Sequence, residues 1–214
     1  MNDTLKKVSF SALMFMMVFS LSFGSFVPST SAALMGGDLV KGPNSDAVYY
    51  INGSTSTKHV FPDAKTYFTW YTNFDGIKAA TIAELDMYPT GTPVSYRPGT
   101  LLVTHPNTAK VYAVEAGGKL RAIPDEATAA ALYGAQWATW VRDVHELTFG
   151  NYTMGSDMAS SMHSEGTLLQ KTGDSTIYRV EGGKIRPFAS TASFDANNLN
   201  YDYVVEVPSI SGYT

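Results

Sequence analysis

Hydrophobic and polar positions along this chain follow one pattern that is repeated three times. In its clearest copy, two β-prone apolar runs, residues 101–103 and 111–114, precede a glycine pair and a stretch in which charged and apolar residues alternate. Alternation of this kind is typical of a strand with one face in water. Residues 110–124 therefore predict two short strands joined by a glycine turn, with a helix after them.

The turn and the helix of this copy each carry a local signal. Gly117 and Gly118 supply the positive φ angles that a tight hairpin needs. Asp125 is an N-cap candidate for an alanine-rich run over residues 127–133, and Gly134 is placed to end that run. These residues predict a helix after the hairpin, lying across one face of the unit.

The first copy carries an equivalent helix signal, and the third copy a weaker one. In the first copy, residues 64–71 follow Pro62 and Asp63. In the third copy an asparagine-rich segment follows Ser190, which predicts only a short helix.

Two landmarks recur at matching intervals along the chain. Glycines open the copies at intervals of 62 and 67 residues, and a central tyrosine follows at intervals of 63 and 66: Gly37, Gly99 and Gly166, with Tyr49, Tyr112 and Tyr178. Repetition at a nearly fixed period is evidence about the whole fold. The sequence predicts an α+β fold of three tandem units, each a small antiparallel β-meander or hairpin with a short helix. The units cover residues 37–91, 99–155 and 166–214, with residues 156–165 as a flexible linker.

The first 32 residues read as a signal peptide and not as part of the fold. Lys6 and Lys7 precede an apolar run over residues 8–26, and a stretch of small residues follows it. Cleavage after Ala32 and cleavage after Ala33 satisfy the small-residue rule equally well. An uncleaved membrane anchor is the alternative, because a run of about twenty residues is long enough to span a bilayer.

Composition narrows the classes of partner and of chemistry. The chain has 214 residues, a formal net charge of −4 and no cysteine. Without a basic run, nucleic acid is not an expected partner. Disulfides, thiol nucleophiles and cysteine-ligated zinc are excluded. Beyond the signal no apolar run is long enough to span a membrane, so the mature chain is expected to be secreted or attached to the cell surface.

The repeated motif resembles one found in exported bacterial cell-surface proteins. It reads Gly-x-Leu-Val/Leu, then Val/Ile-Tyr-x-Val/Ile, then Gly-x-Lys-x-Arg-x-Ile/Phe, then an alanine-rich helix, and it covers residues 37–212. Tandem copies of such repeats occur in S-layer-like and wall-associated proteins. The first copy departs from the motif, with Lys58 and His59 in place of the Lys-x-Arg pair. The resemblance implies a structural or adhesive role outside the cell, and it carries over no catalytic residue.

Signatures of enzymes and of metal sites are weak or missing in the sequence. The motifs of zinc proteases, serine hydrolases, P-loops and dinucleotide sites are all missing. Asp143 and His145 share a strand face and offer two metal ligands, although a solvated strand end is the simpler interpretation. Calcium is a possible cofactor at the turns over residues 44–46 and 73–76. A glycosidase pair such as Glu84 with Asp86 has nothing that marks it as sheltered.

Aromatic and basic residues supply the tentative ligand-binding set. Four aromatics of the first unit form a stripe at helical spacing, which predicts the buried face of a helix: Tyr67, Trp70, Tyr71 and Phe74. Phe68 and Trp140 fall outside that stripe and are candidates for an exposed, sugar-stacking surface. The repeated pairs Lys119/Arg121 and Lys184/Arg186 either bind anionic wall polymer through the guanidinium groups or solubilise an edge strand.

These features favour an exported, non-enzymatic surface protein that acts as a structural, spacer or adhesive module at the cell envelope. A module that binds cell-wall glycan is the alternative, and a secreted hydrolase is a third possibility. The expected partners are cell-wall polymer or other surface proteins, and exposed tyrosine-rich strands permit self-association.

Overall fold

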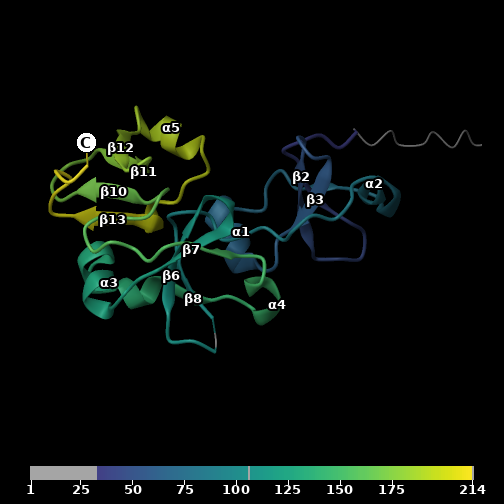
Figure 1. The fold of residues 1–214 in the computed structure, drawn as a ribbon. Coiled ribbons are helices and arrows are strands. Elements are labelled where there is room, and N and C mark those ends of the chain that lie inside the picture. Colours follow the sequence, from purple (N-terminus) through teal and green to yellow (C-terminus); the bar gives the residue numbers. More distant parts are fainter. Residues whose placement is uncertain (1–32, 106, 214) are drawn as a thin grey trace, which may run out of the picture. The chain divides into compact units, whose positions relative to one another are not determined.

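The three sequence units each build a small sheet of their own (Figure 1). The computed structural model describes residues 33–105 and 107–213, so the predicted signal peptide lies outside the described residues. In the first unit the strand order is β3-β2-β1-β4. Its strands are β1 (Leu39–Lys41), β2 (Val48–Asn52), β3 (Thr57–Val60) and β4 (Lys78–Ala79).

The second and third units repeat this order of strands, and the second unit adds a fifth strand beside its third. The second has the order β8-β5-β6-β7-β9, with β5 (Leu102–Thr104), β6 (Val111–Glu115), β7 (Lys119–Ala122), β8 (Val141–Asp143) and β9 (Thr153–Met154). The third has the order β12-β11-β10-β13, with β10 (Leu168–Lys171), β11 (Ile177–Glu181), β12 (Lys184–Pro187) and β13 (Val204–Val207). The expected α+β class with three units is compatible with these three separate sheets.

Each sheet is mixed, which corrects the expectation of purely antiparallel meanders. The first three strands of every unit pair antiparallel, but the fourth strand runs parallel to the first. A helix lies between the third strand and the fourth in all three units. A crossover through a helix returns the chain to the starting end of the sheet, so the next strand runs parallel.

The crossover helices begin where the sequence predicts. They are α1 (Ala64–Trp70), α3 (Glu126–Tyr133) and α5 (Thr191–Asp195). Asp63, Asp125 and Ser190 are the N-caps, and each side chain accepts a hydrogen bond from a backbone N–H three residues on, at 2.7, 2.7 and 3.1 Å. Gly134 ends α3 with a φ of 80°. These N-cap predictions are confirmed because caps depend on local sequence.

Two short helices and three 3₁₀ turns complete the described elements. The helices α2 (Ile82–Asp86) and α4 (Glu146–Phe149) follow the fourth strands of the first and second units. The 3₁₀ segments are η1 (Ala116–Gly118), η2 (Trp137–Trp140) and η3 (Tyr201–Tyr203). Neither α2 nor α4 was predicted from the sequence, although Thr81 and Glu84 form a capping box at the start of α2.

The second and third units share one hydrophobic core. The helix-side face of the second unit, including Leu102 and Ala129, clusters with Leu169 and Val180 of the third unit. Met158, from the segment between the two units, is buried in the same cluster and donates its backbone N–H to Ala122 O at 2.8 Å. The segment predicted as a flexible linker is therefore packed against the second unit.

Candidate functional site

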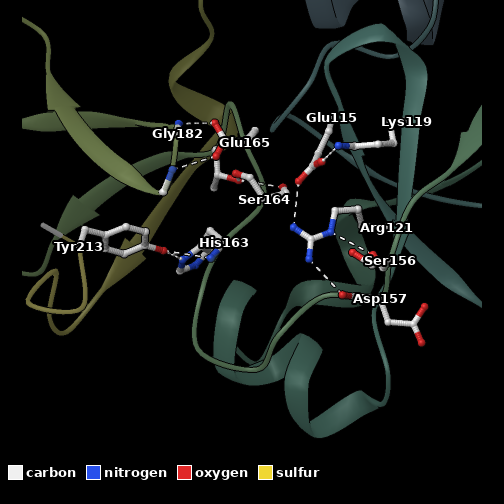
Figure 2. A network of polar contacts seen from close by, with 12 residues as sticks. Glu115, Lys119, Arg121, Ser156, Asp157, His163, Ser164, Glu165, Gly182 and Tyr213 are labelled. Atoms are coloured by element: carbon white, nitrogen blue, oxygen red, sulfur yellow. Dashed lines mark hydrogen bonds and ion pairs between the residues drawn. The ribbon is translucent and has the colours of Figure 1, made fainter.

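Glu115, at the end of β6, is an acidic residue that lies almost fully buried beside two basic residues. Its carboxylate contacts Lys119 Nζ at 2.9 Å and Arg121 Nη1 at 3.2 Å, and its side chain is only 4% exposed. Lys119 and Arg121 lie on β7, across the glycine turn from β6, so the hairpin register brings the three residues together. Figure 2 shows both basic side chains directed at this carboxylate.

The two basic partners set the ionisation of Glu115. Burial alone raises the pKa of this carboxyl, but hydrogen bonds and charge attraction from Lys119 and Arg121 outweigh burial and hold the pKa below its usual value. The carboxylate is therefore ionised at neutral pH, and its negative charge neutralises part of the basic pair.

Arg121 also fastens the chain segment that leaves the second unit. Its Nε donates to Ser156 O at 3.0 Å, and its Nη2 donates to Asp157 O at 3.0 Å (Figure 2). His59 occupies the same strand position in the first unit, and its Nδ1 lies 2.8 Å from Thr92 O. In both units the third-strand basic residue thus holds the segment that leads to the next unit.

His163 lies in a second polar contact between the second and third units. Its Nε2 is 2.5 Å from Leu132 O, and its Nδ1 is 2.6 Å from Tyr213 Oη. Because a carbonyl only accepts, Nε2 carries the proton, and Nδ1 accepts from the tyrosine hydroxyl. Burial lowers the pKa of His163. A histidine in a flexible linker would face solvent, but His163 is partly buried because the linker that carries it is packed.

Glu165 binds the glycine turn of the third unit. Its two carboxylate oxygens accept from the backbone N–H groups of Gly182 and Gly183 at 2.7 and 3.0 Å (Figure 2). Both glycines have positive φ, which turns their N–H groups toward the carboxylate. The end of the linker is thereby attached to the hairpin β11–β12.

The third unit has the same basic pair in a more open setting. Arg186 Nε lies 3.0 Å from Glu181 Oε2, but the Glu181 side chain is 43% exposed. Lys184 is exposed on the same strand. Whether either basic pair binds an anionic polymer stays a prediction. The second-unit pair already has an acidic partner within the fold.

The predicted aromatic candidates lie in different settings. Phe68, on α1, is 37% exposed, whereas Trp140 is half-buried and packs against the two hydrophobic cores of the second unit. Phe74 is exposed, which corrects its expected place on the buried helical stripe. Helix α1 ends at Trp70, so a residue at position 74 no longer follows helical spacing.

The weaker chemical candidates have structural partners. His145 is the N-cap of α4 and accepts from Leu147 N–H through Nδ1 at 3.2 Å. Asn73 accepts from the backbone N–H of Asp75 at 2.9 Å, which is an Asx turn. Within residues 33–105 and 107–213, no group of three or more histidine, cysteine or acidic side chains is arranged to hold a metal ion.

None of the helices in the described part of the chain has the length and hydropathy needed to cross a membrane.

Comparison with known proteins leaves the family open. No protein-family model and no curated protein sequence matches the chain. Among solved structures, it is similar to a chain of the periplasmic assembly from the ESX-5 inner membrane complex, with a TM-score of 0.24 and 12% identity, over 86% of this chain and 63% of that one. A chain of an intact ESX-5 inner membrane complex has a TM-score of 0.23 and 12% identity, over 86% of this chain and 51% of that one. The chain thus spans between about half and two thirds of their length, and likeness at this level carries no functional statement.

Proposed function

We propose that this chain is an exported, non-enzymatic repeat protein that acts as a structural, spacer or adhesive module on the outer face of the cell envelope. The proposal combines the predicted signal peptide and the resemblance to surface repeats with the architecture of the units. Its partners are cell-wall polymer or other surface proteins.

One observation carries the structural part of the proposal. His59 and Arg121, at the same position of successive units, each contact a backbone carbonyl of the segment that leads to the next unit. In the first and second units this repeat position is thus used to bind the segment that leads to the next unit. Side chains that join neighbouring repeats are expected in a structural protein, because such a protein is stabilised by contacts between adjacent repeats.

Export is tested by expressing the chain from its first residue in bacteria and fractionating the culture. The expected result is recovery from the medium or the wall fraction, with a new N-terminus at Ala33 or Leu34. Recovery from the cytoplasm with residues 1–32 still attached would contradict export.

Surface attachment is tested by sedimentation of residues 33–214, which form one compact unit. The protein is centrifuged with purified cell-wall sacculi and alone. Pelleting only with sacculi supports an adhesive role, and pelleting alone supports a self-assembling layer. Protein that stays in the supernatant in both samples rules out attachment by this chain.

A further inference from the structure

An aromatic-walled hollow lies on the helix side of the first unit. It has a volume of about 640 Å³ and is bounded by the end of β3, the start of α1 and the loop after that helix. Phe61, Tyr67 and Phe74 form its apolar wall. Ligand pockets in proteins span roughly 300–1,000 Å³ and combine aromatic walls with a few polar groups.

The third unit has a hollow at the same place, with a volume of about 370 Å³. Most of its lining residues take repeat positions that also line the first hollow. Strand register and the helix N-caps set this correspondence: Asp46 with Ser175, Ala47 with Thr176, Val48 with Ile177, Phe61 with Phe188, Asp63 with Ser190, Tyr67 with Phe194, and Phe74 with Tyr201.

The three aromatic rings keep the same geometry in both hollows. The inner pair, Phe61 with Tyr67, has centroids 5.1 Å apart at 70°, and Phe188 with Phe194 has 5.2 Å at 73°. The outer ring lies against the middle one at 4.8 Å in the first unit and 4.4 Å in the third, at 30° in both. The arrangement is kept although tyrosine and phenylalanine exchange places at two of the three positions.

The outer ring of each set is open to solvent. Phe74 is 53% exposed and Tyr201 is 49% exposed, while the middle rings, Tyr67 and Phe194, are buried. Large aromatic side chains normally gain stability from burial, so a half-exposed ring at the same position of two units is an uncommon use of that residue type. Each outer ring packs against the ring beneath it and leaves about half of its surface in solvent.

The second unit builds the same sheet without this aromatic set. Its equivalents of the three rings are Ile123, Ala129 and Gln136. Ile123 and Ala129 belong to the core that the second unit shares with the third. The repeat fold therefore does not require the aromatic set, and the set occurs in the two units whose helix side carries an open hollow.

Oxygen-bearing side chains border both hollows. Asp46 and Asp63 line the first, and Ser175, Thr176 and Ser190 line the third. No lysine or arginine is among the described residues that line either hollow, which disfavours a polyanion. We propose that the two hollows are a pair of binding sites for a neutral saccharide, which stacks a sugar face on Phe74 or Tyr201 and directs its hydroxyls to the bordering oxygens.

This inference goes beyond the proposed function, because saccharide binding by the purified chain does not depend on export or on wall attachment. It also moves the glycan site away from Trp140 and the basic pairs. Two equivalent sites on one chain make binding to a long polysaccharide stronger than binding to one short sugar, provided that both sites engage together.

Isothermal titration of residues 33–214 with three neutral hexasaccharides tests the proposal: the hexamers of N-acetylglucosamine, β-glucose and α-glucose. At least one is expected to bind at two sites per chain. Phe74→Ala and Tyr201→Ala should each remove one site, and the double variant should remove both. Phe74→Tyr and Tyr201→Phe should keep both sites, since each hollow naturally carries the other ring. Leu147→Ala is the matched control, because Leu147 is 84% exposed and lies on α4, outside both hollows.

Circular dichroism of every variant establishes that the fold is retained. Three results would overturn the proposal. The first is that none of the three sugars binds the folded wild type. The second is that binding persists in the double variant. The third is that the wild type self-associates in sedimentation velocity and the double variant does not. The last result would assign the exposed rings to contacts between copies of the chain.

Discussion

Replacing Glu115 with glutamine is expected to destabilise the protein because it removes the one negative charge that two basic side chains share. The carboxylate is 4% exposed, whereas Lys119 is 49% exposed and Arg121 is 27% exposed. Glutamine has nearly the same shape, so the change removes charge and leaves packing intact. Lys119 returns to water at little cost, but Arg121 stays bound to the linker carbonyls with its charge unbalanced.

The expected loss lies between two limits. Charge-assisted hydrogen bonds contribute about 1.5–3 kcal/mol each, and breaking a fully buried ion pair costs about 3–5 kcal/mol. Because the basic partners are partly exposed and screened by solvent, we expect a loss of about 2 kcal/mol. For a chain of this size, that corresponds to a melting temperature lower by about 4–8 °C.

Thermal unfolding followed by circular dichroism at pH 7 measures this change, and Glu181→Gln is the matched control. Glu181 has the same repeat position, but it is 43% exposed and its partner Arg186 is 67% exposed. An exposed pair contributes about 0.5 kcal/mol or less, so the control should melt within about 2 °C of the wild type. Equal shifts for the two variants, or no shift for Glu115→Gln, would refute the assignment of stability to burial of the pair.

The pH dependence gives an independent check on the same residue. The pKa of Glu115 is lowered by folding, so its contribution is complete above the unfolded value of about 4.3 and is lost as pH falls through the folded value. The difference in melting temperature between the wild type and Glu115→Gln should therefore stay constant from pH 7 to about pH 5 and close in stronger acid. A difference that persists well below the folded pKa would point to lost packing.

Three further changes have expected outcomes that unfolding measurements can check. Gly99→Ala should lower the free energy of unfolding by more than about 2 kcal/mol, because an added Cβ would lie 2.0 Å from Gly166 C. Gly173→Ala, also at positive φ but with open space around it, should lower it by about 1 kcal/mol. Similar losses for the two variants would contradict the predicted clash. His163→Gln should reduce the fall in melting temperature between pH 7 and pH 5.5. Burial lowers the pKa of His163, so its neutral ring stabilises the fold above the unfolded pKa of about 6.5, and this contribution is lost as pH falls through the folded pKa. An unchanged fall in the variant would contradict this reasoning. Asp125→Ala should cost about 1 kcal/mol by removing the N-cap of α3, and an unchanged denaturant midpoint would argue against the cap.

Local chemistry explains which elements the sequence could predict. The alternating strand before Pro124, the glycine turn at Gly117 and Gly118, and the N-caps at Asp125 and Ser190 depend on residues within one turn or one hairpin. Such signals can be read without knowing what packs against them. Helix α2 has a similar local signal at Thr81, which the sequence prediction did not use.

Contacts between residues far apart in the chain were decided by the tertiary structure alone. The parallel fourth strand depends on where the crossover helix returns the chain, and Arg121 meets Ser156 and Asp157 only because the linker runs back along β7. His163 belongs to the segment predicted as a flexible linker, yet it is partly buried against Leu132 because the third unit packs on the second.

The sequence by itself therefore determined the threefold repeat and the hairpin and crossover helix of each unit, because these follow from residues close together in the chain. Only the tertiary structure decided which equivalent positions of the three units differ in burial. The same helix-side face is covered in the second unit and hollowed beside Phe74 and Tyr201 in the first and third. The physical reason is that burial depends on which neighbouring unit packs against a face, and no residue pattern within a single repeat specifies that neighbour.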